Sequence, residues 1–312
     1  MKPYLSIVIP IYNEEESVRA LVKEIETSIA PLKKEYEIIF VDDGSTDETL
    51  PILKSLAKEK KYIKILSHRR NLGKSNALTH GFERAEGEYV ATLDADLQDN
   101  PAEILILLSY LIDHEYDLVT GWRYTRQDTN AIKSVSRIAN SVILKSFKLD
   151  IHDLNCGLKV YHRDAARDLN LYGGLHRFIP IILSEMGYRV AEHKVENRAR
   201  KFGYSKYKAS KVLTDLPDLA TIYFLTKFTD KPLHFFGRIG MIPFLVGTVV
   251  LLYLSFIRLF LDKSIGTRPL LTFGVLLVIF GMQLILTGLL GDLIVNINHR
   301  RKRALPIKYE SH

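Results

Sequence analysis

The chain has 312 residues, enough to bury a full catalytic core, and its formal net charge at pH 7 is +7. Its single cysteine, Cys156, excludes an intramolecular disulfide framework and is typical of a reducing compartment. The sequence has neither zinc-finger spacing nor a basic helix interleaved with aromatic residues, so anionic lipid or phosphate is a better expected partner than nucleic acid.

Strands and helices alternate along the first third of the chain. Apolar runs at residues 5–9, 37–41 and 63–66 predict buried strands, and each is followed by a polar turn and a helical pattern. This alternation predicts a mostly parallel sheet between two layers of helices. Because strand-like sequence starts at once and no signal peptide precedes it, we expect the first domain to lie in the cytoplasm.

The fourth apolar run, residues 89–93, ends in two carboxylates, Asp94 and Asp96, and then Gln98. Alternate side chains of an extended chain point the same way, so we expect both carboxylates at the carboxyl end of a strand, where open α/β sheets bind ligands. Hard oxygen ligands in that place suit Mg²⁺ or Mn²⁺ holding a diphosphate. The alternative is that a short Asp-rich turn only caps the helix that starts at Pro101.

Polar residues from all four strand ends are expected to gather at one edge of this sheet. They are Tyr12, Glu14, Asp42, Asp43, Lys74, Asp94 and Asp96. A nucleotide fits such an edge. Tyr12, Asp42 and Asp43 can contact its base and ribose, while Lys74 and a metal on Asp96 can contact its diphosphate. No P-loop or Gly-X-Gly-X-X-Gly motif follows the first strand, which counts against an NTPase or a dinucleotide-binding dehydrogenase.

Four motifs in a fixed order carry a resemblance to a known family. They are Ile-Pro-Ile-Tyr-Asn-Glu at 9–14, Val-Asp-Asp-Gly-Ser at 41–45, Asn-Leu-Gly-Lys at 71–74 and Asp-Ala-Asp-Leu-Gln-Asp at 94–99. Together they resemble the inverting family 2 glycosyltransferases of the GT-A fold, and among these the polyprenyl-phosphate sugar transferases. The resemblance implies a Rossmann-like, mostly parallel sheet with flanking helices, a nucleotide-diphosphate sugar donor, and a lipid acceptor such as undecaprenyl or dolichyl phosphate.

The resemblance also implies roles for individual residues. Asp96, helped by Asp94 and Gln98, would hold the metal, with Mg²⁺ or Mn²⁺ as the expected cofactor. The donor-binding set is Pro10, Tyr12, Glu14, Asp42, Asp43, Lys74, Asp94 and Lys206, and the catalytic set is Asp96, Asp153, Arg123 and Arg200.

Cations and one more carboxylate come from the middle of the chain. A predicted strand at 117–122 delivers Arg123 to the same edge, although a lone Arg is most often a surface charge. Arg200 and Lys206 belong to a cationic, Gly-containing loop suited to clamping phosphates. Asp153 is the nearest candidate for a general base, or it only positions other groups, because a lipid phosphate already exposes an anionic oxygen.

Four residues are assigned to the phosphate of the acceptor: Lys133, Arg137, His176 and Arg177. The first two lie on the polar side of a predicted amphipathic helix at 131–147, and the others precede an apolar helix. The alternatives are an ordinary solvated face for the basic helix and a satisfied structural role for His176.

The last third of the chain predicts membrane attachment. Residues 239–257 and 270–290 contain no charged residue, and each stretch is long enough to cross the hydrocarbon core. Two buried core helices would need an apolar partner layer that the rest of the chain does not provide. The basic residues of 299–303 then place both ends of the chain on the cytoplasmic side of the inner membrane.

Four segments follow from these patterns. They are a cytoplasmic catalytic domain (1–206), amphipathic helices at the membrane interface (207–236), a two-span hairpin (237–298) and a basic cytoplasmic tail (299–312).

The predicted function is inverting transfer of a hexose-type sugar from a nucleotide diphosphate to a polyprenyl phosphate. One rival is a transferase that acts on a glycolipid or a growing polysaccharide. Another is a non-catalytic membrane scaffold that binds nucleotide or lipid, although the intact Asp94 and Asp96 argue against it. The sequence does not distinguish a uridine from a guanosine nucleotide in the donor, nor does it identify the sugar. The resemblance suggests a homo-oligomer.

Overall fold

A computed structural model of the chain describes residues 2–124, 149–196, 198, 224, 228, 231–262, 264 and 269–302. Contacts within the chain divide it into two units, residues 1–219 and 220–312.

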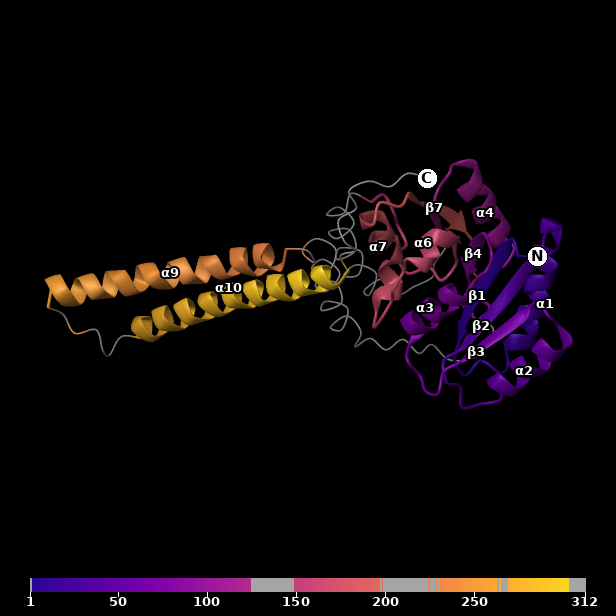
Figure 1. Ribbon diagram of the computed structural model, residues 1–312, viewed down its shortest axis with the longest axis horizontal. Helices are drawn as coiled ribbons and strands as arrows, with labels where there is room; N and C mark the ends of the chain where they lie inside the picture. Colours follow the sequence, from indigo (N-terminus) through magenta and orange to yellow (C-terminus); the bar gives the residue numbers. More distant parts are fainter. Residues whose placement is uncertain are drawn as a thin grey trace. The chain divides into compact units, whose positions relative to one another are not determined.

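The first unit (Figure 1) is built on a sheet. Its seven described strands lie in the order β3-β2-β1-β4-β6-β5-β7. β1 (Leu5–Ile11) pairs in parallel with β2 (Tyr36–Asp42) and β4 (Tyr89–Thr92), and β2 pairs in parallel with β3 (Ile63–Ser67). β6 (Lys159–His162) runs antiparallel to both β4 and β5 (Leu118–Arg123), and β7 (Val190–Val195) lies parallel to β5. The predicted mostly parallel sheet is confirmed, with a reversed strand in its middle.

Helices cover both faces of this sheet. They are α1 (Val18–Ile29), η1 (Ala30–Leu32), α2 (Thr49–Glu59), α3 (Lys74–Arg84), α4 (Glu103–Asp113), α6 (Arg163–Arg167), η2 (Leu175–Phe178) and α7 (Ile179–Glu185). Alternate β1 residues such as Ile7 and Ile9 share one core with apolar residues of α1, α2 and α4. On the other face α3 approaches so closely that a Cβ on Gly81 would lie 2.3 Å from Val8 Cγ1. Since strand side chains alternate between faces, nearly every residue of β1 is buried.

The turn that bears the predicted metal ligands differs from the expected extended strand. β4 ends at Thr92, and Leu97 has a φ of 60°. Even so, Asp94, Asp96 and Gln98 are half-buried, whereas the residues between them are buried. The three polar side chains are therefore the more exposed members of the turn, as alternation predicted.

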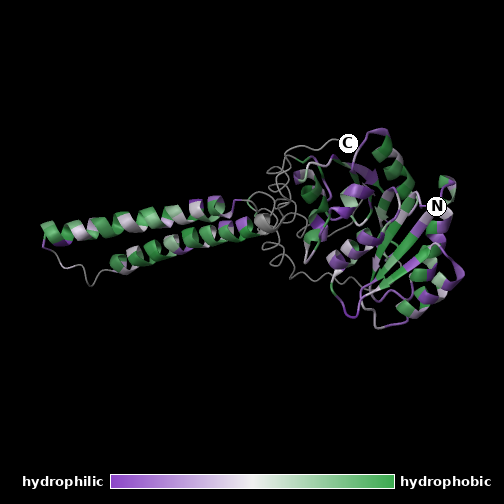
Figure 2. Cartoon of the chain, viewed as in Figure 1, coloured by the Kyte–Doolittle hydropathy of each residue, from purple (hydrophilic) through white to green (hydrophobic). Residues whose placement is uncertain are grey.

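The second unit is a helical hairpin of α9 (Pro232–Phe260) and α10 (Pro269–Lys302). Both helices are long and apolar enough to cross a membrane, with mean hydropathies of 2.2 and 2.3 over their best windows. Figure 2 shows apolar residues along most of their length. Glycines allow close packing, because a Cβ on Gly240 would lie 2.7 Å from the carbonyl oxygen of Gly281. The two predicted spans lie inside these helices, and α9 begins at Pro232, within the stretch assigned to the membrane interface.

Candidate functional site

A carboxylate and a cation meet where β4 ends and α3 begins. Lys74 Nζ lies 2.5 Å from Asp94 Oδ1, and the two side chains are 32% and 34% exposed. Burial alone would raise the pKa of Asp94, but the charge and hydrogen bond of Lys74, together with the charges of Lys159 and Arg123, lower the pKa below its ordinary value. Asp94 is therefore an ionised carboxylate at neutral pH, held beside a fixed ammonium group.

Asp96 continues the same turn. Its Oδ1 accepts a hydrogen bond of 3.2 Å from the backbone N–H of Gln98. Carboxylate and amide oxygens fit a hard divalent cation. Within the described ranges no group of three or more His, Cys, Asp or Glu side chains is arranged to hold a metal ion. Mg²⁺ bound to one or two carboxylates usually takes its other ligands from substrate phosphates and water.

Two buried ionisable groups near this turn were not assigned from the sequence. Asp99 is 5% exposed, and burial, followed by the nearby Asp94 carboxylate, raises its pKa to about 7. Lys159 of β6 is 3% exposed, donates to the carbonyl oxygen of Cys156, and has its pKa lowered by burial. Lys159 lies inside an apolar, strand-like run of the sequence. This pattern could have identified it, because a lysine is rarely buried unless it is paired.

Arg123 and Asp153 form a two-pronged ion pair. Arg123 Nε lies 2.7 Å from Asp153 Oδ2, and Arg123 Nη2 lies 3.1 Å from Asp153 Oδ1. The side chains are only 16% and 11% exposed. Burial alone would raise the pKa of Asp153, but the hydrogen bonds and charge of Arg123 leave it below its ordinary value. Asp153 is thus a weak base, and the pair is suited to positioning.

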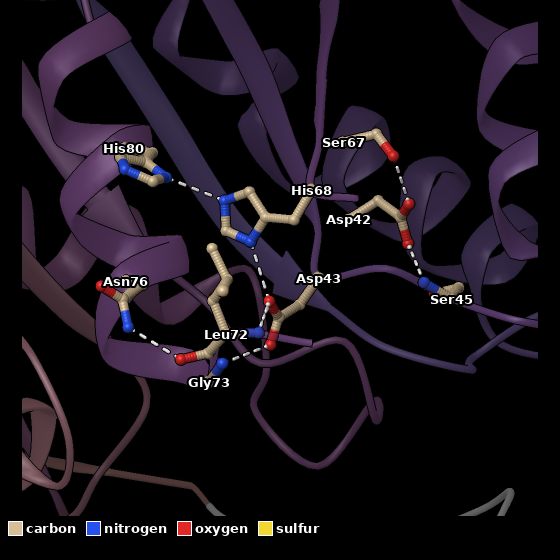
Figure 3. Close-up of polar contacts among 9 residues, drawn as sticks. All are labelled: Asp42, Asp43, Ser45, Ser67, His68, Leu72, Gly73, Asn76 and His80. Atoms are coloured by element: carbon tan, nitrogen blue, oxygen red, sulfur yellow. Dashed lines mark hydrogen bonds and ion pairs between the residues drawn. The ribbon is translucent and has the colours of Figure 1, made fainter. Parts of the chain in front are cut away.

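The two aspartates at the end of β2, Asp42 and Asp43, accept hydrogen bonds from the chain's own donors (Figure 3). Asp42 is fully buried and accepts from the Ser45 backbone N–H at 3.0 Å and from Ser67 Oγ at 2.7 Å. Asp43 accepts from the backbone N–H groups of Leu72 and Gly73, each at 2.8 Å. Both carboxylates therefore shape the turns at this edge, and direct contact with a nucleoside stays a prediction for each.

The turn after β1 is tied to the turn after β2. The backbone N–H of Glu14 donates to Thr49 Oγ1 at 2.9 Å, and that of Asn13 donates to Ser45 Oγ at 3.0 Å. Pro10, Tyr12 and Glu14 are half-buried at this place. The structure therefore brings the predicted nucleoside-binding residues of both turns to one edge of the sheet.

His176 links η2 to α3. The Ser75 hydroxyl donates its proton to the Gly173 carbonyl at 2.8 Å, so His176 Nδ1, 2.9 Å from Ser75 Oγ, must carry the proton of that contact. Burial, with Lys74 and Arg177 nearby, lowers the pKa of His176 to about 3. A neutral ring with an accepting Nε2 does not attract a phosphate oxygen. This geometry favours the structural alternative for His176, while Arg177 beside it keeps its predicted role.

Four predicted residues lie outside the described part of the chain: Lys133, Arg137, Arg200 and Lys206. Their assignments to acceptor and diphosphate phosphates stay predictions.

The comparison with known families decides the class. Residues 6–169 match the family described as glycosyl transferase family 2, which is more than half of the 312-residue chain. The chain belongs to this family. The membership predicted from the four ordered motifs is therefore confirmed.

Two relatives are similar to this family 2 transferase along nearly its full length. A dodecaprenyl-phosphate galacturonate synthase of Rhizobium johnstonii is 36% identical over 300 residues, which cover 95% of this chain and 89% of the relative. An undecaprenyl-phosphate 4-deoxy-4-formamido-L-arabinose transferase of Pectobacterium carotovorum is 36% identical over 295 residues, covering 94% of this chain and 88% of the relative.

Solved structures share the fold. Glucosyl-3-phosphoglycerate synthase from Mycobacterium tuberculosis, in complex with Mn²⁺, uridine diphosphate and glucosyl-3-phosphoglycerate, is 18% identical with a TM-score of 0.54. The match covers 72% of this chain and 80% of that one. At this level of identity the similarity concerns the fold, and it confirms the predicted GT-A architecture.

Proposed function

We propose that this glycosyltransferase moves a sugar from a nucleotide-diphosphate sugar to a polyprenyl phosphate at a membrane surface. The observation that carries the proposal is the Lys74–Asp94 pair beside Asp96 at the carboxyl end of β4. Support for the acceptor comes from two relatives named for polyprenyl phosphates and from two helices long and apolar enough to span a membrane.

The reaction is written as a single inverting displacement. An oxygen of the lipid phosphate attacks the anomeric carbon, a new C–O bond forms, and the bond to the nucleotide diphosphate breaks. Negative charge grows on the departing diphosphate, so cations placed there lower the barrier. Lys74 and Arg123 are two described cations proposed for this task, and Arg200 and Lys206 are proposed for the same task.

A divalent metal, Mg²⁺ or Mn²⁺, fits the oxygen donors of Asp94, Asp96 and Gln98. When bound, it would neutralise charge on the diphosphate. Because Lys74 already pairs with Asp94, we assign Asp96 as the main protein ligand. Asp153 positions Arg123 and takes no proton in this scheme, since the attacking phosphate oxygen is already anionic.

Both ends of the hairpin are proposed to lie on the cytoplasmic side of the inner membrane, because basic residues follow the apolar part of α10. The catalytic unit would then meet donor from the cytoplasm and acceptor from the bilayer. We also propose that the chain self-associates through its spans, because its resemblance to the polyprenyl-phosphate sugar transferases suggests a homo-oligomer.

The test uses membranes that contain the full chain, undecaprenyl or dolichyl phosphate, and labelled nucleotide sugars, with the lipid product identified by mass. Asp96→Ala is expected to lower transfer at least about 100-fold, the loss typical of removing charge stabilisation at a transition state. The matched control is Asp113→Ala, at the exposed C-terminal end of α4. Full transfer by Asp96→Ala would exclude the metal assignment. The absence of a lipid product from the unmodified chain with every donor would favour a scaffold.

A further inference from the structure

Three polar side chains contact one another beside the loop that contains Leu72 and Gly73 (Figure 3). Asp43 follows β2, His68 follows β3, and His80 lies on α3. His68 Nδ1 is 2.8 Å from Asp43 Oδ1, and His68 Nε2 is 2.8 Å from His80 Nδ1. The side chains of His68 and Asp43 are only 8% and 6% exposed. These residues, the Asp43–His68–His80 chain, link the ends of two strands to a helix.

The proton positions in this chain follow from its geometry. Asp43 accepts two backbone N–H groups, so its third contact is a hydrogen bond donated by His68 Nδ1. One proton then lies between His68 Nε2 and His80 Nδ1, whichever ring carries it. Both nitrogens of His68 are thereby engaged, and its ring orientation is fixed.

The same carboxylate holds the loop that leads to Lys74. Asp43 binds the N–H groups of Leu72 and Gly73, and Asn76 Nδ2 donates to the Leu72 carbonyl at 2.7 Å. Gly73 has a φ of 91° and directly precedes Lys74, the first residue of α3. The position of these two peptide groups therefore sets where the Lys74 side chain starts.

Packing confirms that the loop is held closely. Gly44, with a φ of 75°, lies so near the loop that a Cβ would come within 2.6 Å of the Arg70 carbonyl carbon. A lysine at a helix N-terminus also opposes the helix dipole. Its ammonium group thus depends on other contacts, here Asp94 and a rigid loop.

We propose that His68 and His80 are positioning residues for the transfer reaction, acting through Asp43 and residues 68–73 on Lys74. The inference rests on the proposed function, in which Lys74 meets the donor diphosphate. It assigns Asp43 to holding the loop, and the two histidines to orienting Asp43 and tying α3 to the sheet. Removing the tie should displace Lys74 without removing any group that touches substrate.

The first test compares two changes at His80. His80→Leu removes the polar atom at the Nδ1 position, whereas His80→Asn keeps one at nearly the same distance from the backbone. We expect His80→Leu to lower kcat about tenfold or more, since displacement by ~1 Å can cost about 100-fold. His80→Asn should recover most of that loss. The control is His114→Leu, an exposed histidine at the end of α4 whose ring Nδ1 contacts the Tyr110 carbonyl at 3.0 Å.

Two substitutions at His68 distinguish its contact with Asp43 from its contact with His80. His68→Asn retains a polar atom near the Nδ1 position and so the bond to Asp43, whereas His68→Gln retains one near the Nε2 position, facing His80. Because Asp43 binds the loop directly, His68→Asn should keep more activity than His68→Gln. The reverse order would contradict the proposal.

A double-mutant cycle with Lys74→Met separates positioning from general stability. If His80 acts through Lys74, His80→Leu should have little further effect on kcat once Lys74 is replaced. An equal fold loss in both backgrounds would overturn the proposal. So would a loss in His80→Leu explained wholly by a smaller folded fraction.

Amide hydrogen exchange provides a readout that is independent of activity. Peptides that contain Leu72 and Gly73 should exchange faster in His80→Leu than in the unmodified chain, and His80→Asn should restore protection. Unchanged exchange would overturn the inference even if transfer occurs. Faster exchange in a chain that makes no lipid product would instead contradict the proposed function alone.

Discussion

The carboxylate of Asp94 packs directly against the backbone of Gly157. A Cβ on Gly157 would lie 2.5 Å from Asp94 Cγ and 2.6 Å from its Oδ2. Gly157 does not have a positive φ. A larger residue at this position is therefore excluded by the Asp94 carboxylate and not by backbone strain. The segment before β6 thus fixes one side of Asp94, while Lys74 fixes the other.

Gly157→Ala is therefore expected to displace Asp94 from Lys74. We expect a loss in kcat of about tenfold or more, because reacting groups tolerate little displacement. Steady-state transfer to a polyprenyl phosphate measures it. The control Gly237→Ala, where a Cβ would make an ordinary contact of 3.4 Å with Leu233 Cδ1, should leave kcat unchanged. Normal turnover in Gly157→Ala would show that Asp94 can move without consequence.

Lys159→Met tests the buried cation of β6. Its ammonium group contributes charge close to Asp94 and Asp153, while its burial in an apolar strand costs desolvation. Methionine fills a similar volume, so we expect an unchanged or higher Tm together with a kcat about tenfold lower. The exposed Lys54 on α2 is the matched control, as Lys54→Met. A parallel fall in Tm and activity would assign Lys159 to folding alone.

Asp153→Asn distinguishes a positioning carboxylate from a general base. Because Arg123 keeps the pKa of Asp153 below its ordinary value, Asp153 is ionised across neutral pH. The pH profile of kcat between about pH 6 and 8 should therefore contain no limb from this residue. Asn retains one hydrogen bond to Arg123, so we expect partial activity with the same pH profile. Loss of all measurable transfer would instead favour proton abstraction by Asp153.

Local sequence patterns predicted much of the fold and part of the candidate site. The apolar runs before Asp42 and Asp94 predicted β2 and β4, because a buried parallel strand needs apolar side chains on both faces. Polar residues at those strand ends could then be placed at one edge of the sheet, where Lys74 and Asp94 indeed meet.

The remaining features depend on contacts between distant parts of the chain. The reversal of β6 between β4 and β5 has no local signal, because a strand's direction is set by its connections. The same holds for the contact between His68 and His80, which joins the residue after β3 to α3, a helix that packs on β1 and β2. Lys159 becomes a site residue only through its place in the middle of the sheet.

His176 should affect stability in acid and not catalysis at neutral pH. Its pKa is about 3 in the folded chain, against 6.5 ordinarily, so between these values only the unfolded chain binds the proton. Its stabilising contribution is thus complete above pH 6.5 and is lost as the pH falls toward 3, by at most about 1.4 kcal/mol per pH unit. His176→Asn keeps a donor for Ser75 without titrating. Followed by fluorescence of the single tryptophan, Trp122, its Tm should therefore fall less between pH 7 and pH 5 than that of the unmodified chain, and equal falls would contradict this assignment.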